Sequence, residues 1–174
     1  MTMQTDVLQA RITQTGWLVQ VPCRVKGVSL RGNASGVARV FMFDTSTAPT
    51  TASYGQSTTT VTVTSTAHGL QTGDWVGIGY VPDASQRSGT CGQYQITRTG
   101  ADTFTITDPN SSTVTSSTVC YYVKGPNRWI YVKGLGASDQ YVNYELLPGE
   151  GIRAMQKVYA IFNTYLQSAI VYYG

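Results

Sequence analysis

The run Thr60-Val61-Thr62-Val63-Thr64 sets the fold class, because polar and apolar residues alternate in it at every position. This period of two is typical of a strand with one buried face and one polar face. Further short runs repeat the pattern with turn residues between them, over residues 75–78, 94–97 and 103–107. We therefore predict a small β-domain, a barrel or a sandwich, over residues 57–125.

The segments on either side of this block show the same strand periodicity. Residues 24–31 alternate, and Gly27 interrupts the alternation where we expect a bulge. Residues 37–44 are apolar on both faces near their end, which is typical of a strand inside a sandwich. After a break at residues 125–127 the pattern resumes over residues 128–133, 141–146, 152–154, 157–163 and 168–173. No segment carries a helical stripe, so the predicted fold class is all-β.

These observations predict two nested domains. Residues 11–56 and residues 126–174 together form a two-sheet, jelly-roll-like sandwich, and residues 57–125 form a second domain inserted in one of its loops. Insertion costs little free energy there, because loop-closure entropy grows slowly with length. Residues 45–60 are rich in Thr, Ser, Ala, Pro and Gly, so we expect a linker or long loop. Residues 1–10 are expected to form an N-terminal arm, a short helix or a frayed end.

The composition favours a binding or structural protein over several other classes. Only 12% of the residues are charged, about half the usual fraction. Burying a surface with few charges costs little desolvation free energy, because few charged side chains lose their hydration. The net charge is +3, and the basic residues are scattered without interleaved aromatic residues, so we expect no nucleic-acid partner. No apolar run reaches the length of a membrane span, and the N-terminus lacks the pattern of a signal peptide, so we expect no membrane partner.

The cysteines and the single histidine give no metal-site pattern. Cys91 and Cys120 both fall in the central block, where they form either a redox-sensitive bridge or two small buried thiols, and Cys23 lies in the outer part. No Cys-x-x-Cys spacing exists, and His68 is the sole histidine. The glycines match neither a phosphate-binding loop nor a dinucleotide fingerprint. We expect no metal and no cofactor.

Catalytic patterns are equally weak. His68 lies between Ala67 and Gly69, so we expect it to shape a turn, and no Gly-x-Ser-x-Gly elbow is present. Most carboxylates fall in turns, where they cap the backbone. Glu145 in a strand and Glu150 in a turn are the two that paired-carboxylate chemistry would use, but a surface or turn role is favoured. We expect the protein not to be an enzyme.

Tyrosine is abundant toward the C-terminal end, and some of these side chains must point out of a sheet only two layers thick. Tyrosine combines a large contact area with a hydrogen-bonding tip, and it is enriched at interfaces. A sugar-binding platform uses the same residues, and tyrosines also flank cores. The candidate interface residues are Tyr131, Tyr141, Tyr144, Tyr165, Tyr172 and Tyr173.

Several short motifs of the outer segments resemble a family of small virion proteins of tailed phages. They are Val25-Lys26-Gly27-Val28, a strand ending in Phe43-Asp44, the turn at residues 147–153, and the terminus Ile170-Val171-Tyr172-Tyr173-Gly174. The central block resembles modules of phage tail and head appendage proteins through His68-Gly69-Leu70, Gly73-Asp74, residues 92–96 and residues 103–106. The resemblance covers most of the chain beyond residue 10. It implies a structural role in a virion and brings no catalytic residue with it.

The resemblance leads to an expected function. We expect a non-enzymatic virion protein, made in the host cytoplasm, that decorates or cements the exterior of a phage capsid. Its partners would be major capsid or tail proteins of the same virion, in a homo-oligomer or symmetric array where many weak contacts add up. The alternative is a tail-associated or head-fibre protein that contacts glycans on the host surface.

Overall fold

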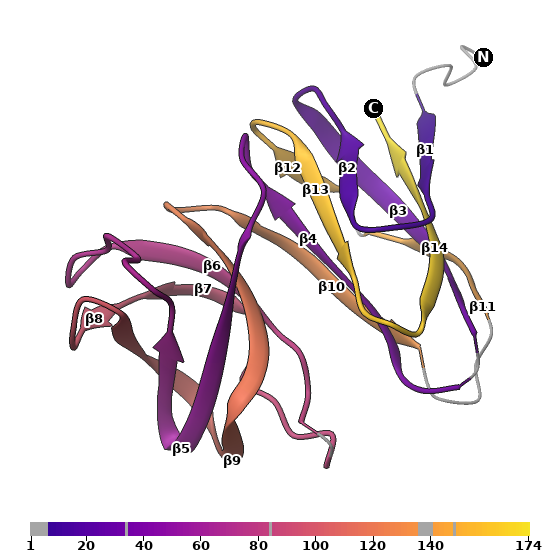
Figure 1. Cartoon of the computed structure of the whole chain (residues 1–174). Coiled ribbons are helices and arrows are strands. Elements are labelled where there is room, and N and C mark those ends of the chain that lie inside the picture. The colour runs from indigo at the N-terminus through magenta and orange to yellow at the C-terminus, as the bar shows by residue number, and fades with distance from the viewer. Residues whose placement is uncertain (1–6, 34, 84, 136–140, 148) are drawn as a thin grey trace. The chain divides into compact units, whose positions relative to one another are not determined.

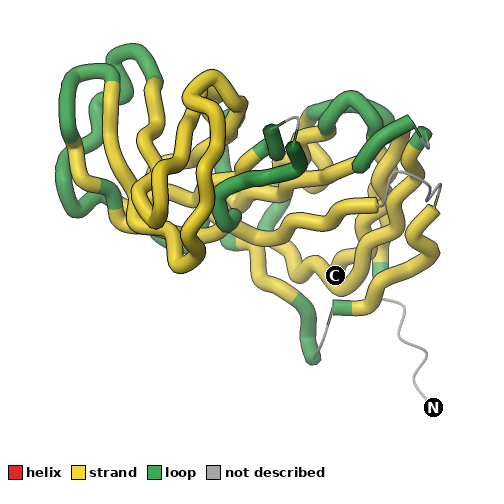
Figure 2. Tube along the Cα trace, turned by 90° about the horizontal axis from the view of Figure 1, so that it is seen from below, coloured by secondary structure: helices red, strands yellow, loops and turns green. Residues whose placement is uncertain are grey.

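The computed structural model describes residues 7–33, 35–83, 85–135, 141–147 and 149–174. These residues form strands, turns and loops without a helix, as Figure 2 shows. The strands belong to three sheets, and every strand pair with a described register is antiparallel. The chain divides into two compact units (Figure 1). Unit 1 comprises Met1–Ala48 with Ile130–Gly174, and unit 2 comprises Pro49–Trp129. The all-β prediction is confirmed.

Unit 1 contains two of the three sheets. The first sheet has the order β1-β14-β3-β11, with β12 also paired to β3. Its strands are β1 (Leu8–Ile12), β3 (Cys23–Gly32), β11 (Tyr141–Leu146), β12 (Ile152–Ala154) and β14 (Leu166–Tyr173). The second sheet has the order β10-β4-β13-β2. Its strands are β2 (Gly16–Val19), β4 (Ala38–Asp44), β10 (Trp129–Leu135) and β13 (Val158–Phe162).

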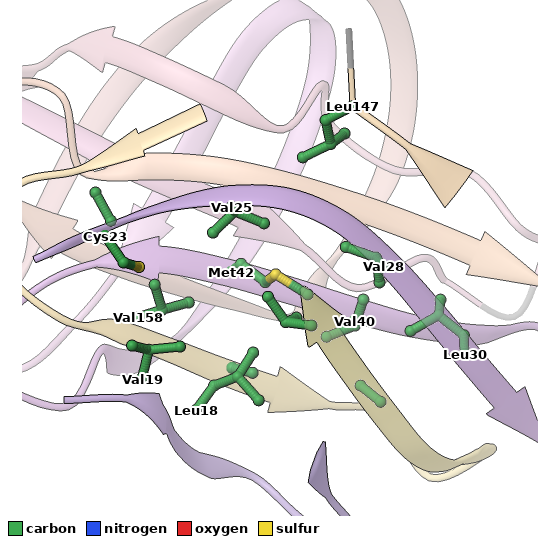
Figure 3. Packing of buried hydrophobic residues seen from close by; sticks show 14 of the residues in the cluster. Leu18, Val19, Cys23, Val25, Val28, Leu30, Val40, Met42, Leu147 and Val158 are labelled. Atoms are coloured by element: carbon green, nitrogen blue, oxygen red, sulfur yellow. The ribbon is translucent and has the colours of Figure 1, made fainter. Parts of the chain in front are cut away.

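The two sheets of unit 1 share one apolar core. Strand alternation turns every second side chain of each sheet toward this interior. Val25 and Val28 come from the first sheet, and Val40 and Met42 come from the second. Figure 3 shows the side chains of β3, β4, β13 and β2 meeting in this interior. The core therefore joins strands from both ends of the chain.

Strand β4 is apolar on both faces, as its sequence predicts. Val40 and Met42 belong to the core between the sheets, whereas Phe41 and Phe43 alternate with them and point to the opposite face. Both phenylalanines are nevertheless buried. Phe41 lies opposite Ile161 of β13, so an aromatic and aliphatic row continues across this face of the second sheet.

Unit 2 contains the third sheet, with the order β5-β9-β6-β7 and β8 paired to β9. Its strands are β5 (Thr50–Thr64), β6 (Trp75–Tyr80), β7 (Gly92–Gln95), β8 (Thr97–Arg98) and β9 (Thr103–Lys124). Strand β9 pairs with β8 near its start and with β6 at its end. The strands of this sheet pack on a second core that includes Tyr54, Val61, Ile78, Phe104 and Tyr122.

Two expectations about irregular segments are wrong. Residues 50–60 of the expected linker belong to β5, whose threonines and serines pair with β9, as in Thr51 with Tyr121. Threonine is a good strand former when a partner strand is present, so composition alone misleads here. Residues 8–10 of the expected arm belong to β1, where Leu8 lies opposite Tyr173. The partner strand lies at the other end of the chain, so a local pattern cannot reveal it; residues 1–6 lie outside the described residues.

Most of the expected strands and turns are confirmed within one or two residues. The bulge expected at Gly27 is confirmed, because the pairing between β3 and β14 shifts between Val25 and Gly27. The turn after β11 contains Gly149 and Gly151, both with positive φ. Positive φ favours glycine, since a side chain crowds the backbone in that region.

Gly151 is the more constrained of these two glycines. Its φ is 80°, and a Cβ there would overlap the carbonyl oxygen of Val25 on β3. We predict that Gly151→Ala lowers the free energy of unfolding of unit 1 by at least about 2 kcal/mol, measured by urea denaturation. Gly149→Ala is the matched control, because its φ is also positive, at 66°, but open space surrounds the site. This variant should lower the free energy of unfolding by about 1 kcal/mol. Equal losses for the two variants would contradict the contact with β3.

Candidate functional site

An open groove lies where the chain crosses from the first sheet to the second. Residues 11–17 end β1, form the connection and begin β2, and they line a groove of about 620 Å³. The hydroxyl of Thr15 accepts a hydrogen bond from the backbone N–H of Phe162 at 2.9 Å. This bond ties the connection to the end of β13, so the groove has one fixed wall.

Trp17 is the large side chain of the groove. It lies opposite Tyr159 of β13, with the two rings edge to face at 86° and their centroids 4.9 Å apart. The ammonium of Lys157 lies 5.3 Å from the centre of the indole. Such edge-to-face and cation–π contacts hold an aromatic ring in one orientation. Trp17 is half-buried, so part of it remains open to solvent, and the residue lines the groove.

The polar side chains of the groove are exposed and carry no negative charge. Arg11 and Gln14 are both open to solvent. In the part of the chain that the structure describes, no carboxylate pairs with Arg11. The groove thus combines a guanidinium, an amide, threonine hydroxyls and an indole. This set can bind and orient a polar ligand, but it lacks a paired nucleophile and base.

The candidate tyrosines have different environments. Tyr165 is 39% exposed, and its ring packs on Gly36, where a Cβ would lie 2.6 Å from a ring carbon. Tyr172 and Tyr173 are half-buried on β14, and Tyr173 packs against the core of unit 1. The side chains of Tyr131, Tyr141 and Tyr144, on β10 and β11, lie outside the described residues. The use of these six residues at an interface stays a prediction.

His68 shapes a turn, as its sequence context predicts. The backbone N–H of Leu70 donates to Nδ1 at 3.0 Å, and Nε2 lies 3.3 Å from the carbonyl oxygen of Thr103. Because Nδ1 accepts a hydrogen bond, the proton of the neutral ring is on Nε2, which donates to Thr103. The ring also meets Phe104 edge to face at 5.2 Å. Both nitrogens are therefore engaged with the backbone rather than with a carboxylate.

This arrangement predicts the tautomer of His68. The long-range ¹H–¹⁵N spectrum of the neutral side chain should show the Nε2–H form, with no overlap from a second histidine. His68→Ala should lower the stability of unit 2 by about 1–2 kcal/mol, because the N–H of Leu70 loses its acceptor. The Nδ1–H form would contradict the assigned hydrogen bonds.

The two glutamates singled out from the sequence pair with cations in unit 1. Glu145 lies 2.7 Å from the ammonium of Lys133, which joins β11 to β10, and Glu150 lies 3.2 Å from the guanidinium of Arg24. The surface and turn roles expected for them agree with these contacts.

Asp74 and Asp108 hold the backbone of unit 2. Asp74 accepts from the N–H of Gln71 at 2.9 Å, and this bond together with Lys124 holds its pKa below the ordinary value. Asp108 is buried and accepts from the hydroxyl of Thr90 and the N–H of Asn110, both at 2.7 Å. Within the described ranges, no group of three or more His, Cys, Asp or Glu side chains is placed to hold a metal ion.

The loop between β6 and β7 is organised by Asp83. Its carboxylate accepts from the N–H of Ser85 and of Arg87, and it pairs with the Arg87 guanidinium at 2.9 Å. Burial raises the pKa of Asp83, but these hydrogen bonds and the guanidinium lower it by more, so the pKa lies below its ordinary value. A depressed pKa stabilises the fold above the unfolded-state pKa, and the contribution is lost as the pH falls through the folded-state pKa.

Asp83→Asn should therefore lower the urea midpoint of unit 2 at pH 7. The difference from the original protein should shrink as the pH falls, and vanish below both pKa values. Arg87→Gln should weaken the same pH dependence, because it removes the paired charge. A difference that stays constant from pH 7 to pH 2 would contradict the assigned role.

Cys23, Cys91 and Cys120 form no disulfide and are thiols. Cys120 lies opposite Tyr80 on one side of β6, whereas the sulfur of Cys91 accepts from the Tyr80 N–H at 3.2 Å on the other. Burial, with a smaller effect of Cys91, raises the pKa of Cys120 well above its ordinary value. Of the two alternatives for this pair, the structure has the thiols.

The search for protein families and the search for curated relatives gave no match. No family model matches the chain, and no curated protein matches it. The described residues include no helix that is long and apolar enough to cross a membrane.

The groove of residues 11–17 was not anticipated from the sequence. Its one signal is a tryptophan that follows the polar run Thr13-Gln14-Thr15 and Gly16 between two strands.

Proposed function

We propose that this chain is a non-enzymatic structural protein of a tailed-phage virion, most simply a decoration or cement protein on the capsid exterior. The supporting observation is the uncharged surface of the β5–β9 ribbon. Strand β5 has no charged residue, and β9 has only Asp108 and Lys124. Asp108 is 1% exposed, and Lys124 pairs with Asp74 at the end of the ribbon.

Threonine pairs cover much of this ribbon. Thr60 lies opposite Thr107, and Thr62 lies opposite Thr105. Hydroxyl groups cost less to remove from water than ions do, and short side chains lose little rotamer entropy on contact. Such a face suits burial against a neighbouring subunit. The proposed partners are major capsid or tail proteins of the same particle, arranged symmetrically so that many weak contacts add up.

The proposal includes the domain arrangement. Unit 1 is taken as a jelly-roll-like sandwich, and unit 2 as a small domain inserted between β4 and β10. These two strands are neighbours in the second sheet, so a short hairpin connection would join them if unit 2 were absent. The separate cores of the two units support independent folding.

Replacing residues 49–129 by a short Gly-Ser linker tests this arrangement. The shortened chain should unfold in one cooperative urea transition, because its core residues all lie outside the deletion. Residues 49–129 expressed alone should also unfold cooperatively. A deleted chain that is unfolded in buffer, beside a folded fragment 49–129, would contradict the independence of unit 1.

The location on a particle has its own test. Purified virions that contain this protein should bind a gold-labelled antibody over the head, as seen by electron microscopy. Label confined to the tail or to head fibres would favour the alternative role, an appendage protein that contacts host glycans. Particles without label would contradict both roles.

A further inference from the structure

We propose that the groove lined by residues 11–17 binds an acidic saccharide, with a sugar ring packed on Trp17 and a sugar carboxylate held by Arg11. This site goes beyond the structural role proposed above and does not depend on it. The groove measures about 620 Å³, within the usual range of ligand sites. It is more open than enclosed, so it suits a segment of a longer chain better than an enclosed small molecule.

Trp17 provides the platform. Its indole is held by the ring of Tyr159 and by the ammonium of Lys157. A ring that is fixed before binding loses little entropy when a ligand covers it. Sugar rings present a flat face of C–H groups with hydroxyls at the rim, and an indole beside polar side chains matches both parts.

The charge of the groove selects an anion. Arg11 is exposed on the edge strand β1 and has no carboxylate partner among the described residues. Lys157 places a second positive charge beside the indole. Residues 11–17 contain no Asp or Glu. A carboxylate entering this groove would make a charge-assisted hydrogen bond with the guanidinium and meet no like charge there.

The remaining polar side chains of the groove can form hydrogen bonds with sugar hydroxyls. The Thr15 oxygen accepts from the Phe162 N–H, which leaves its own proton free to donate. Gln14 offers an amide donor and an amide acceptor to solvent. A sugar with adjacent hydroxyls uses such donors and acceptors together. An acidic peptide would satisfy the cations but would leave the indole and this hydroxyl set without a matching partner.

The experiment is a titration of the full chain by isothermal calorimetry at 150 mM salt. The probes are the tetrasaccharide of galacturonic acid, neutral cellotetraose and tetraglutamate. We expect saturable binding of the galacturonic acid tetramer and at least tenfold weaker binding of the other two. Arg11→Gln should weaken binding about tenfold, the loss of one charge-assisted hydrogen bond. Gln14→Ala should weaken it several-fold, and Trp17→Ala should abolish it.

Matched controls separate the site from general effects. Arg153→Gln removes another exposed cation of unit 1, and Trp75→Ala removes an exposed tryptophan of unit 2. Both should leave the affinity unchanged. The thermal midpoints of Arg11→Gln and Gln14→Ala should also be unchanged, because both side chains are exposed.

Three results would overturn the proposal. They are an absence of saturable binding by the galacturonic acid tetramer, an affinity that neither Arg11→Gln nor Gln14→Ala reduces, and equal binding of tetraglutamate, which would indicate a charged patch alone.

Discussion

The shared interior of β3, β4, β13 and β14 is the constraint on which unit 1 depends. Val28 of β3 lies opposite Val171 of β14, and Val40 and Val158 fill the same core from the other sheet. These residues come from segments separated by the whole of unit 2. Bringing them together costs loop-closure entropy, and only the burial of their apolar side chains offsets that cost. The core of unit 1 contains no residue of unit 2.

The same constraint explains what the sequence could predict. Strong local alternation marks residues 60–64 and 75–80, so those strands were predictable from neighbouring residues alone. Strand β1 has five residues and depends on β14 at the far end of the chain. Residues 50–54 have a loop-like composition and become strand because β9 lies beside them. Pairing with a strand far away in the sequence makes both segments strands, and no local sequence pattern contains that information.

The candidate site follows a similar rule. The turn role of His68 was predictable, because a histidine before a glycine at the end of a strand is a local feature. The groove was not, because it requires Trp17 of β2 to meet Tyr159, and Thr15 of the preceding connection to meet Phe162, on the distant strand β13. Of the tyrosines proposed from composition, Tyr165 lies in the turn before β14, and Tyr172 and Tyr173 are half-buried on β14.

Two kinds of surface emerge from this arrangement. The β5–β9 ribbon is neutral and rich in hydroxyls, which suits repeated contact with neighbouring subunits at low desolvation cost. The groove of residues 11–17 is small and positive, which suits one selected anionic ligand. Both proposed roles, contact with neighbouring subunits and binding of an anionic ligand, rest on the complementarity of these surfaces to a partner.

Native-state hydrogen exchange tests the central claim most directly. If both ends of the chain build one core, the slowest amides of β3, β4, β13 and β14 share a single opening free energy. The account predicts that these amides share one opening free energy, and that the slowest amides of β5, β6 and β9 have a different one. Amides of β13 and β14 that open at a much lower free energy than those of β3 and β4 would contradict it.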